Sequence, residues 1–291
     1  MRVAVLGMGR MGHALAERLL SGGHTLTVWN RTPGKADDLA GRGARQAATP
    51  AEAAAGNELS LTSLADDAAV RAVVTGRDGA AAGLGDGVLG DASTVSTQTT
   101  VRLSEAAHGR FLATPILGAP ATVLRAEATY LIGGPRQHYE RARPAYRTLA
   151  DDSHRRYVGE DPTVATTLKL ISNYLLMTGI ANLAEAVATA QAAGLKDALI
   201  RDYLGGLPLV APGLRNRLDD LISGEHRGWF PTTLGAKDVR LAEELAQGHD
   251  LRLPLAEAVR RRYEEAAADG WDNADITAIV ELVRRQPMRH H

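Results

Sequence analysis

The stretch MRVAVLGMGRMGHALAERLLSGGHTLTVWN, residues 1–30, decides the fold of this chain. Residues 2–6 form a short apolar run with β-branched members, which predicts a strand. A glycine-rich turn, GMGRMG, follows at once, and residues 13–20 then place apolar side chains on one face of a helix. Residues 25–29, TLTVW, predict a second strand. In this strand–turn–helix–strand context, a G-x-G-x-x-G sequence predicts a dinucleotide-binding unit.

Each glycine of the turn has a separate physical task. Gly7 permits the tight turn, Gly9 leaves room for a pyrophosphate, and Gly12 lets the helix pack close to the strand. The N–H groups and the positive end of the helix dipole would then face the phosphates. A glycine-rich turn that binds nothing is the alternative. The expected cofactor-binding residues of the turn are Gly7, Met8, Gly9, Arg10, Met11 and Gly12.

The end of the second predicted strand indicates which dinucleotide binds. An NAD site usually has Asp or Glu there, which accepts hydrogen bonds from the ribose 2′-hydroxyl. This chain has Asn30-Arg31-Thr32, so no carboxylate of this tripeptide repels a 2′-phosphate. The Arg31 guanidinium can pair with such a phosphate, and Asn30 and Thr32 can donate further hydrogen bonds. The sequence therefore favours NADP(H); the alternative is that Arg31 is a solvated turn residue.

Length and composition indicate a globular protein of two domains. The chain has 291 residues, 45% of them hydrophobic and 23% charged, which is ordinary for a soluble protein. Its net charge of −1 gives no indication of a nucleic-acid or membrane partner. The lack of cysteine excludes disulfides, zinc–thiolate sites and cysteine nucleophiles, and we expect no metal.

The same sequence favours a cytoplasmic protein. No apolar run approaches the ~20 residues of a membrane span. A strand that begins at residue 2 leaves no room for a signal peptide. The terminal pair His290-His291 is either native or the remnant of a tag, and we give it no role.

Strand and helix patterns alternate through the first half of the chain. Further strands are expected at residues 58–64, 87–91, 128–134 and 155–158, and helices at 33–43, 48–55, 68–74, 97–108 and 135–149. This alternation predicts a doubly wound, mostly parallel α/β sheet, which binds ligands at the carboxyl ends of its strands. Leu64 and Thr94 follow two such ends and are expected to line the cofactor. Ser96 or Thr97 is expected to cap a helix.

From Asp161 the pattern becomes helical throughout. Residues 162–193 are apolar at helical spacing and predict a long helix of ~45 Å that forms the core of an all-α domain. Shorter helices are expected at residues 197–203, 212–222, 234–247, 255–269 and 273–284. The predicted domains are therefore a Rossmann domain for NADP over residues 1–160 and an all-α domain over residues 161–291.

Two further motifs lie in the helical half. Lys169-Leu170-Ile171-Ser172-Asn173 stands on the long helix, where Lys169 and Asn173 share a face because they are four residues apart. Residues 234–242, LGAKDVRLA, stand on a later helix. With the glycine turn, these motifs resemble the β-hydroxyacid dehydrogenase family, which includes 3-hydroxyisobutyrate dehydrogenase and is related to the imine reductases. The resemblance covers nearly the whole chain.

The resemblance implies a mechanism and an assembly. Lys169 would be the general acid/base that exchanges a proton with the substrate oxygen, and Asn173 would hold that oxygen or orient the lysine. Lys237 and Thr94 would contact the cofactor near the nicotinamide, and two chains would form a homodimer with intertwined α-domains. The chemistry is sound in itself, since a positioned cation stabilises the charge that hydride transfer builds on a carbonyl oxygen. The alternatives are a Lys169 that snorkels at the helix edge and a Lys237 that is only a surface charge.

The segment expected to bind the substrate departs from the family pattern. The family commonly reads D-A-P-V-S-G-G, whereas residues 113–119 read ATPILGA, so Leu117 replaces the serine that binds a carboxylate. Leucine cannot donate a hydrogen bond, which favours an apolar aldehyde, ketone or imine over a small 3-hydroxyacid. Thr114 or Thr122 could substitute as donors. The candidate substrate-binding residues are Leu117, Gly118, Thr114, Tyr174 and Trp229, with partner-chain residues around 208–212 or Trp229 completing the pocket.

The chemistry of Lys169 decides how we rank the candidate functions. A lysine suits carbonyl reduction, because the product oxygen needs a proton, whereas a charged lysine would repel a cationic iminium. The related imine reductases typically have Asp or Tyr at this position. We therefore expect an NADP(H)-dependent hydroxyacid or carbonyl oxidoreductase first, an imine reductase second, and a non-catalytic NADPH-binding protein third.

Overall fold

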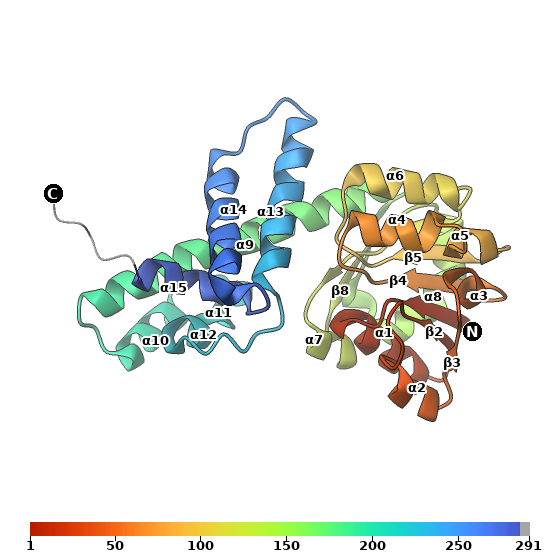
Figure 1. The fold of residues 1–291 in the computed structure, drawn as a ribbon, viewed down its shortest axis with the longest axis horizontal. Coiled ribbons are helices and arrows are strands. Elements are labelled where there is room, and N and C mark those ends of the chain that lie inside the picture. Colours follow the sequence, from red (N-terminus) through yellow and green to blue (C-terminus); the bar gives the residue numbers. More distant parts are fainter. Residues whose placement is uncertain (286–291) are drawn as a thin grey trace. The chain divides into compact units, whose positions relative to one another are not determined.

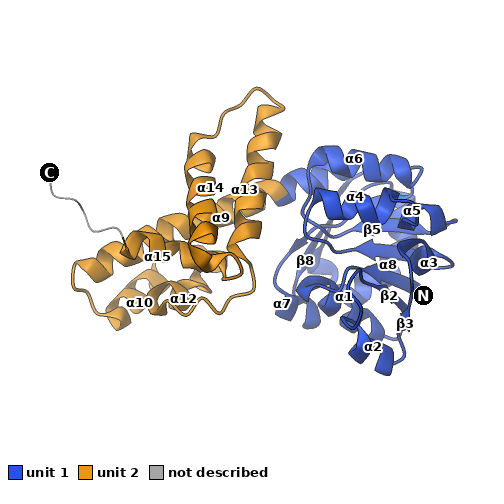
Figure 2. Ribbon diagram, in the orientation of Figure 1, with its two compact units in different colours: residues 1–169 blue, residues 170–291 orange. Residues whose placement is uncertain are grey.

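The computed structural model describes residues 1–285 (Figure 1). It divides into two compact units, Met1–Lys169 and Leu170–His291 (Figure 2). The division falls within one continuous helix, α9 (Pro162–Ala192). Our domain boundary between residues 160 and 161 stays a prediction, because the first residues of α9 group with the first unit. The His290-His291 pair lies outside the described residues.

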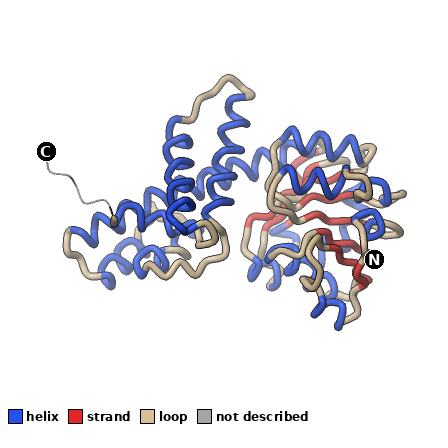
Figure 3. The backbone as a smooth tube through the Cα atoms, viewed as in Figure 1, coloured by secondary structure: helices blue, strands red, loops and turns tan. Residues whose placement is uncertain are grey.

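The first unit is a mostly parallel sheet with helices on both faces (Figure 3). The strand order is β3-β2-β1-β4-β5-β6-β8-β7, and β9 pairs with β8. β8 runs antiparallel to β6 and β7, and the other pairs are parallel. The doubly wound fold is therefore confirmed. The strands are β1 (Arg2–Leu6), β2 (Thr25–Trp29), β3 (Arg45–Gln46), β4 (Leu59–Thr62), β5 (Val88–Asp91), β6 (Phe111–Ala113), β7 (Ile116–Leu117), β8 (Thr129–Gly133) and β9 (Arg155–Gly159).

The helices of the first unit begin where side chains satisfy their N–H groups. Asp66 accepts a hydrogen bond from the Ala69 amide, and Ser96 accepts one from the Thr99 amide, which confirms the capping role expected of Ser96. These caps fix the ends of the loops that follow β4 and β5. The helices are α1 (Arg10–Ser21), α2 (Asp37–Gly41), α3 (Pro50–Ala54), α4 (Asp67–Thr75), α5 (Ala80–Gly83), α6 (Thr97–Ala106), α7 (Pro120–Leu124) and α8 (Arg136–Leu149).

The second unit is all-helical over its described residues. Its core gathers the buried side chains of Met177, Ile180 and Val187 on α9 with Tyr263, whose hydroxyl donates to the Met177 carbonyl at 3.2 Å. The other helices are α10 (Asp197–Gly206), α11 (Pro212–Arg215), α12 (Leu218–Ser223), α13 (Thr232–Gln247), α14 (Pro254–Ala266), the π-helical turn η2 (Ala267–Trp271), the 3₁₀ turn η3 (Ile276–Ala278) and α15 (Ile279–Arg284). An all-α second half is therefore confirmed.

Several predicted elements differ from the structure. The helix predicted over residues 212–222 is two helices, α11 and α12, because the chain breaks at Asn216 and buries Arg217. The helix predicted over 33–43 begins only at Asp37, after a turn in which Gly34 has a φ of +81°. β3, α5 and α7, each of two to five residues, were not predicted, since so short a run carries no periodicity.

The apolar length of α9 exceeds what we expected. Among the described residues, α9 alone is long and apolar enough to cross a membrane by length and composition, with a mean hydropathy of 1.2 over its most apolar window. Of this window, 39% is buried inside the protein. By length and composition alone, α9 therefore departs from the expectation that no apolar run approaches a membrane span.

Candidate functional site

The glycine turn joins β1 to α1 at the carboxyl edge of the sheet. Gly7 has a φ of +102°, and a Cβ there would lie 2.4 Å from the Ser63 carbonyl oxygen. A Cβ at Gly12 would lie 1.9 Å from the Gly7 carbonyl oxygen, so the helix can pack on the turn only with glycine. A Cβ at Gly9 would meet no atom within 4 Å. The turn is therefore closed on its protein side and open at Gly9.

The first turn of α1 lies next to this opening. α1 begins at Arg10, its N-cap Gly9 is exposed, and no side chain caps it. Arg10 is exposed, and Met11 packs partly against the core. The N–H groups of an uncapped first turn lack intrahelical acceptors and attract anions. An open glycine beside such a terminus fits a dinucleotide pyrophosphate.

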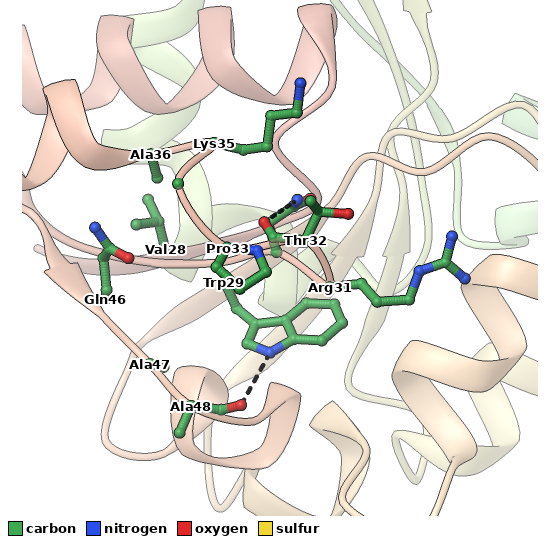
Figure 4. Close-up of a pocket in the computed structure, with 12 residues that line it drawn as sticks. Val28, Trp29, Arg31, Thr32, Pro33, Lys35, Ala36, Gln46, Ala47 and Ala48 are labelled. Atoms are coloured by element: carbon green, nitrogen blue, oxygen red, sulfur yellow. Dashed lines mark hydrogen bonds between the residues drawn. The ribbon is translucent and has the colours of Figure 1, made fainter.

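A cavity of about 280 Å³ lies at the end of β2 (Figure 4). Trp29 forms part of its wall and donates from Nε1 to the Ala48 carbonyl at 3.3 Å. Arg31 and Lys35 extend from its loop, and none of the residues that line it is acidic. Sequence reasoning missed Lys35, although the signal was present in the run N-R-T-P-G-K, where the Pro-Gly turn brings the lysine back to the cavity.

Asn30 connects this cavity to the glycine turn. Its Oδ1 accepts a hydrogen bond from the Met8 amide at 2.9 Å, and its Nδ2 donates to the Thr32 carbonyl at 2.8 Å. Both the oxygen and the nitrogen of the side-chain amide are thus hydrogen-bonded within the protein. This geometry gives no support to the expected hydrogen bond from Asn30 to a 2′-phosphate; it gives Asn30 a bridging role instead.

Leu64 and Thr94 lie on the loops that follow β4 and β5. Both side chains are half-buried. The Leu64 amide donates to the Ser93 hydroxyl at 2.9 Å, which ties one loop to the other. Leu64 Cδ2 lies 2.7 Å from the position a Cβ of Gly7 would take, so Leu64 packs on the glycine turn.

Lys169 is held within the first unit. Its Nζ donates to the Ile116 carbonyl at 2.6 Å, and the side chain is half-buried. Thr166, one turn earlier on α9, bonds the Thr100 hydroxyl at 2.8 Å and fixes this part of the helix on α6. Ile116 opens the segment that carries Leu117 and Gly118, both half-buried. The structure therefore brings Lys169 to the segment predicted to bind the substrate.

The two threonines expected to replace the family's serine serve the fold. Thr114 is fully buried, and its hydroxyl donates to the Asp91 carbonyl at 3.3 Å. The Thr122 hydroxyl bonds the Ala119 amide and carbonyl, both at 2.8 Å, at the start of α7. Neither geometry supports a hydrogen bond to a substrate.

Asn173 and Lys237 meet at one carboxylate in the second unit. Asn173 Nδ2 donates to Asp238 Oδ2 at 2.5 Å, and Lys237 Nζ lies 3.0 Å from Asp238 Oδ1. Asn173 and Asp238 are 4% and 1% exposed, so this is a buried ion pair with a hydrogen-bonded amide. Sequence reasoning gave Asp238 no functional role. The sequence indicated Asp238 only by its position directly after Lys237. Asn173 lies 65 residues earlier, and only the fold brings these two side chains together.

Trp229 and Tyr174 are half-buried in the second unit. The Trp229 ring stacks on Phe230 at 5.6 Å and lies 5.3 Å from the Arg217 guanidinium carbon. Arg217 in turn pairs with the buried Asp275 at 3.3 Å. Tyr174 packs against the helical core. These contacts fix the Trp229 ring and leave the substrate roles of both residues as predictions.

The fold and this site define a class of protein. A doubly wound sheet with an open glycine turn, followed by an all-α unit reached through a lysine-bearing helix, is the architecture of a nicotinamide-dependent oxidoreductase. Residues 2–159 match the family model of the NAD binding domain of 6-phosphogluconate dehydrogenase. Residues 164–283 match the model described as NAD-binding of NADP-dependent 3-hydroxyisobutyrate dehydrogenase. The chain belongs to the β-hydroxyacid dehydrogenase family, and it is an oxidoreductase that acts on CH–OH groups with NAD(P).

Individual relatives agree with this assignment. The chain is 32% identical over 292 residues to an uncharacterized oxidoreductase of Bacillus subtilis, YfjR, covering 98% of this chain and 100% of that one. It is 29% identical over 291 residues to the chloroplastic glyoxylate/succinic semialdehyde reductase 2 of Arabidopsis thaliana, covering 99% and 80%.

Solved structures share the fold. The 3-hydroxyisobutyrate dehydrogenase of Salmonella typhimurium has a TM-score of 0.87 at 23% identity, covering 97% of this chain and 99% of that one. The imine reductase of Streptomyces aurantiacus has a TM-score of 0.64 at 26% identity, covering 98% and 100%.

Proposed function

We propose that this chain is an NADP(H)-dependent oxidoreductase that transfers hydride between the nicotinamide and an alcohol–carbonyl pair, with Lys169 as the general acid/base. The observation that carries this proposal is the hydrogen bond from Lys169 Nζ to the Ile116 carbonyl. It holds a half-buried ammonium at the segment that the sequence assigns to the substrate. A proton donor fixed in that position can protonate a carbonyl oxygen as charge develops on it.

The preference for NADP(H) over NAD(H) is supported by the cavity at the end of β2. Arg31 and Lys35 both line it and both are exposed, so either side chain can turn toward a 2′-phosphate. The lining residues include no carboxylate to accept a ribose 2′-hydroxyl.

The bound nicotinamide would supply or accept the hydride, and the protein would move the proton and orient the substrate and the cofactor. Lys169 would give a proton to the carbonyl oxygen or take one from the alcohol. Asn173 would hold the same oxygen or orient the lysine, with its amide plane fixed by Asp238. Lys237 and Thr94 would contact the cofactor near the nicotinamide.

The substrate segment favours an apolar carbonyl compound. Leu117 offers no hydrogen bond to a carboxylate, and the hydroxyls of Thr114 and Thr122 are engaged within the fold. The Arabidopsis relative is named for glyoxylate and succinic semialdehyde, so these aldehydes belong in the first assay beside more apolar ones. The same leucine favours an imine as the second candidate substrate.

We also propose a cytoplasmic homodimer joined through the α-domains. The second unit exposes large apolar side chains in helical pairs, Ile171 with Leu175 on α9 and Leu199 with Tyr203 on α10, and Leu209 is 86% exposed. Neighbouring exposed apolar side chains such as these pairs offer a surface for association. A second copy of the chain would cover it and would bring residues around 208–212 or Trp229 to complete the pocket.

The test measures oxidation of NADPH and NADH with glyoxylate, succinic semialdehyde, a branched apolar aldehyde and a cyclic imine. We expect carbonyl turnover with kcat/KM at least about tenfold higher for NADPH, and Arg31→Ala should lower that preference while Lys35 remains. Arg77→Ala, which removes an exposed arginine of the same unit, is the matched control. Faster turnover of the imine than of every aldehyde would replace the first substrate class by the second, and cofactor binding without any turnover would leave a binding protein.

A further inference from the structure

A buried carboxylate lies at the carboxyl edge of the sheet, outside every role assigned above. Asp91 is the last residue of β5 and is paired in register with Thr62, the last residue of β4. The two side chains are 3% and 0% exposed. Asp91 Oδ1 accepts a hydrogen bond from the Thr62 hydroxyl at 2.7 Å and another from the Ser93 amide at 3.1 Å. One oxygen thus binds both strand ends.

The contacts of Asp91 continue to the glycine turn. Ser93, which Asp91 fixes, accepts the hydrogen bond of the Leu64 amide through its hydroxyl. The Ala92 amide donates to the Thr62 carbonyl at 2.9 Å, which adds a second tie between the loops. Leu64 in turn packs on Gly7. The chain of contacts therefore runs from Asp91 through Ser93 and Leu64 to the turn at Gly7.

A second carboxylate, that of Asp67 at the start of α4, makes a similar pair of contacts with Ser96. Asp67 Oδ1 accepts hydrogen bonds from the Ser96 amide at 3.0 Å and from the Ser96 hydroxyl at 2.5 Å. Thr94 lies between the two fixed serines. The loop that carries it is thus held at both ends against the loop of Leu64.

We propose that Asp91 is a positioning residue for the dinucleotide, which holds the loops of Leu64 and Thr94 at the depth where they meet the cofactor. This inference rests on the proposed cofactor site and adds a residue to it. Asp91 is only 3% exposed, so it would act through Ser93 and Thr62. Hydrogen bonds to an ionised acceptor are stronger than those to a neutral one, so the loops are held best by the carboxylate form.

The charge state of Asp91 changes within an accessible pH range. Burial raises the pKa of this carboxyl to about 6, with Asp67 raising it further and the hydrogen bonds from Ser93 and Thr62 opposing the rise. The titratable groups that face it are Asp67 on α4 and Tyr146 on α8. Below that pH the group is neutral and its hydrogen bonds weaken. Cofactor affinity should therefore fall when Asp91 is protonated.

The experiment compares the wild type with Asp91→Asn, which keeps an oxygen acceptor and removes the charge. The dissociation constant of NADP⁺ is measured by titration calorimetry from about pH 5 to about pH 8. We expect the ratio of the two constants to be about fivefold near pH 8 and to approach one near pH 5. The ratio cancels the titration of the ligand's own phosphate, because both proteins meet the same ligand.

Two further variants make the outcome decisive. Ser93→Ala removes the acceptor of the Leu64 amide and should weaken binding about fivefold at every pH, which tests the same contact chain if Asp91→Asn does not fold. Asp78→Asn, at an exposed carboxylate of the same unit, should change nothing. If the wild type binds NADP⁺ and the dissociation constants of Asp91→Asn and the wild type are equal at every pH, the role of Asp91 is overturned but the proposed function is not. Failure of the wild type to bind either dinucleotide would instead overturn the proposed function.

Discussion

The two lysines of the candidate site are held by different kinds of acceptor. Lys237 lies against the carboxylate of Asp238, so the loss of its proton would leave a buried charge uncompensated. Lys169 donates to the backbone carbonyl of Ile116 at 2.6 Å. We expect Lys169 to exchange the proton and Lys237 to stay a fixed cation beside Asp238.

Replacement of Lys169 separates chemistry from binding. Lys169→Ala should lower kcat for carbonyl reduction by about 10²- to 10⁴-fold, because the positioned proton donor is lost. The dissociation constant of NADPH should stay within about twofold, since the turn at Gly9 and the cavity at Arg31 are untouched. Steady-state kinetics and a fluorescence titration measure the two quantities, with Lys196→Ala as an exposed lysine control. An equal loss of both would remove the catalytic assignment.

At the scale of elements, periodicity and turn chemistry predicted most of the fold. β1 and β2 were predicted with the bounds that the structure has, and α9 within a single residue, because each is long or strongly patterned. The glycine turn could be located from its spacing together with the strand and helix patterns on either side of it. Elements that depend on tertiary contacts were missed, such as β3 and the break at Asn216. The partners of Lys169 and Asn173 could not be predicted either, because Ile116 and Asp238 lie 53 and 65 residues away.

Replacing two glycines of the same turn by alanine should affect different properties, stability at Gly12 and cofactor affinity at Gly9. Gly12→Ala forces a Cβ onto the Gly7 carbonyl, so the free energy of unfolding should fall by about 1–3 kcal/mol. Gly9→Ala meets no atom at a φ of −71°, so stability should be unchanged while the methyl obstructs the approaching pyrophosphate. Urea denaturation and NADP⁺ titration of both variants measure these effects. Normal cofactor affinity in Gly9→Ala would place the pyrophosphate elsewhere.

For the whole molecule, Asp91 makes stability depend on pH. Its pKa is about 6 in the folded chain and 3.8 as the ordinary value, so between these limits the folded state binds more protons than the unfolded state. Stability from this group is present below pH 3.8 and is lost as the pH rises through 6.

The difference in unfolding free energy between Asp91→Asn and the wild type should therefore shift by roughly 3 kcal/mol in favour of the variant over that range. Urea denaturation at several pH values measures this shift. A difference that does not vary with pH would show that the carboxyl titrates at its ordinary value.

The assembly proposed above can be tested on one exposed leucine. Leu175→Glu places a charge in the apolar surface of α9, where Leu175 is 64% exposed, and should convert the dimer to a monomer. Val101→Glu changes an exposed apolar residue on α6 of the first unit and should leave the dimer intact. Size-exclusion chromatography with light scattering reads the mass. If the wild type already runs as a monomer, the homodimer proposal falls.

The bridge made by Asn30 has a consequence for redesign of this protein. Any exchange of the loop after β2 to switch coenzyme would also disturb the amide of Met8, because one side chain serves both places. A library that varies residues 31–35 while keeping Asn30 should retain diphosphate recognition in most clones. Randomising residue 30 as well would couple two traits that an engineer wants to tune independently.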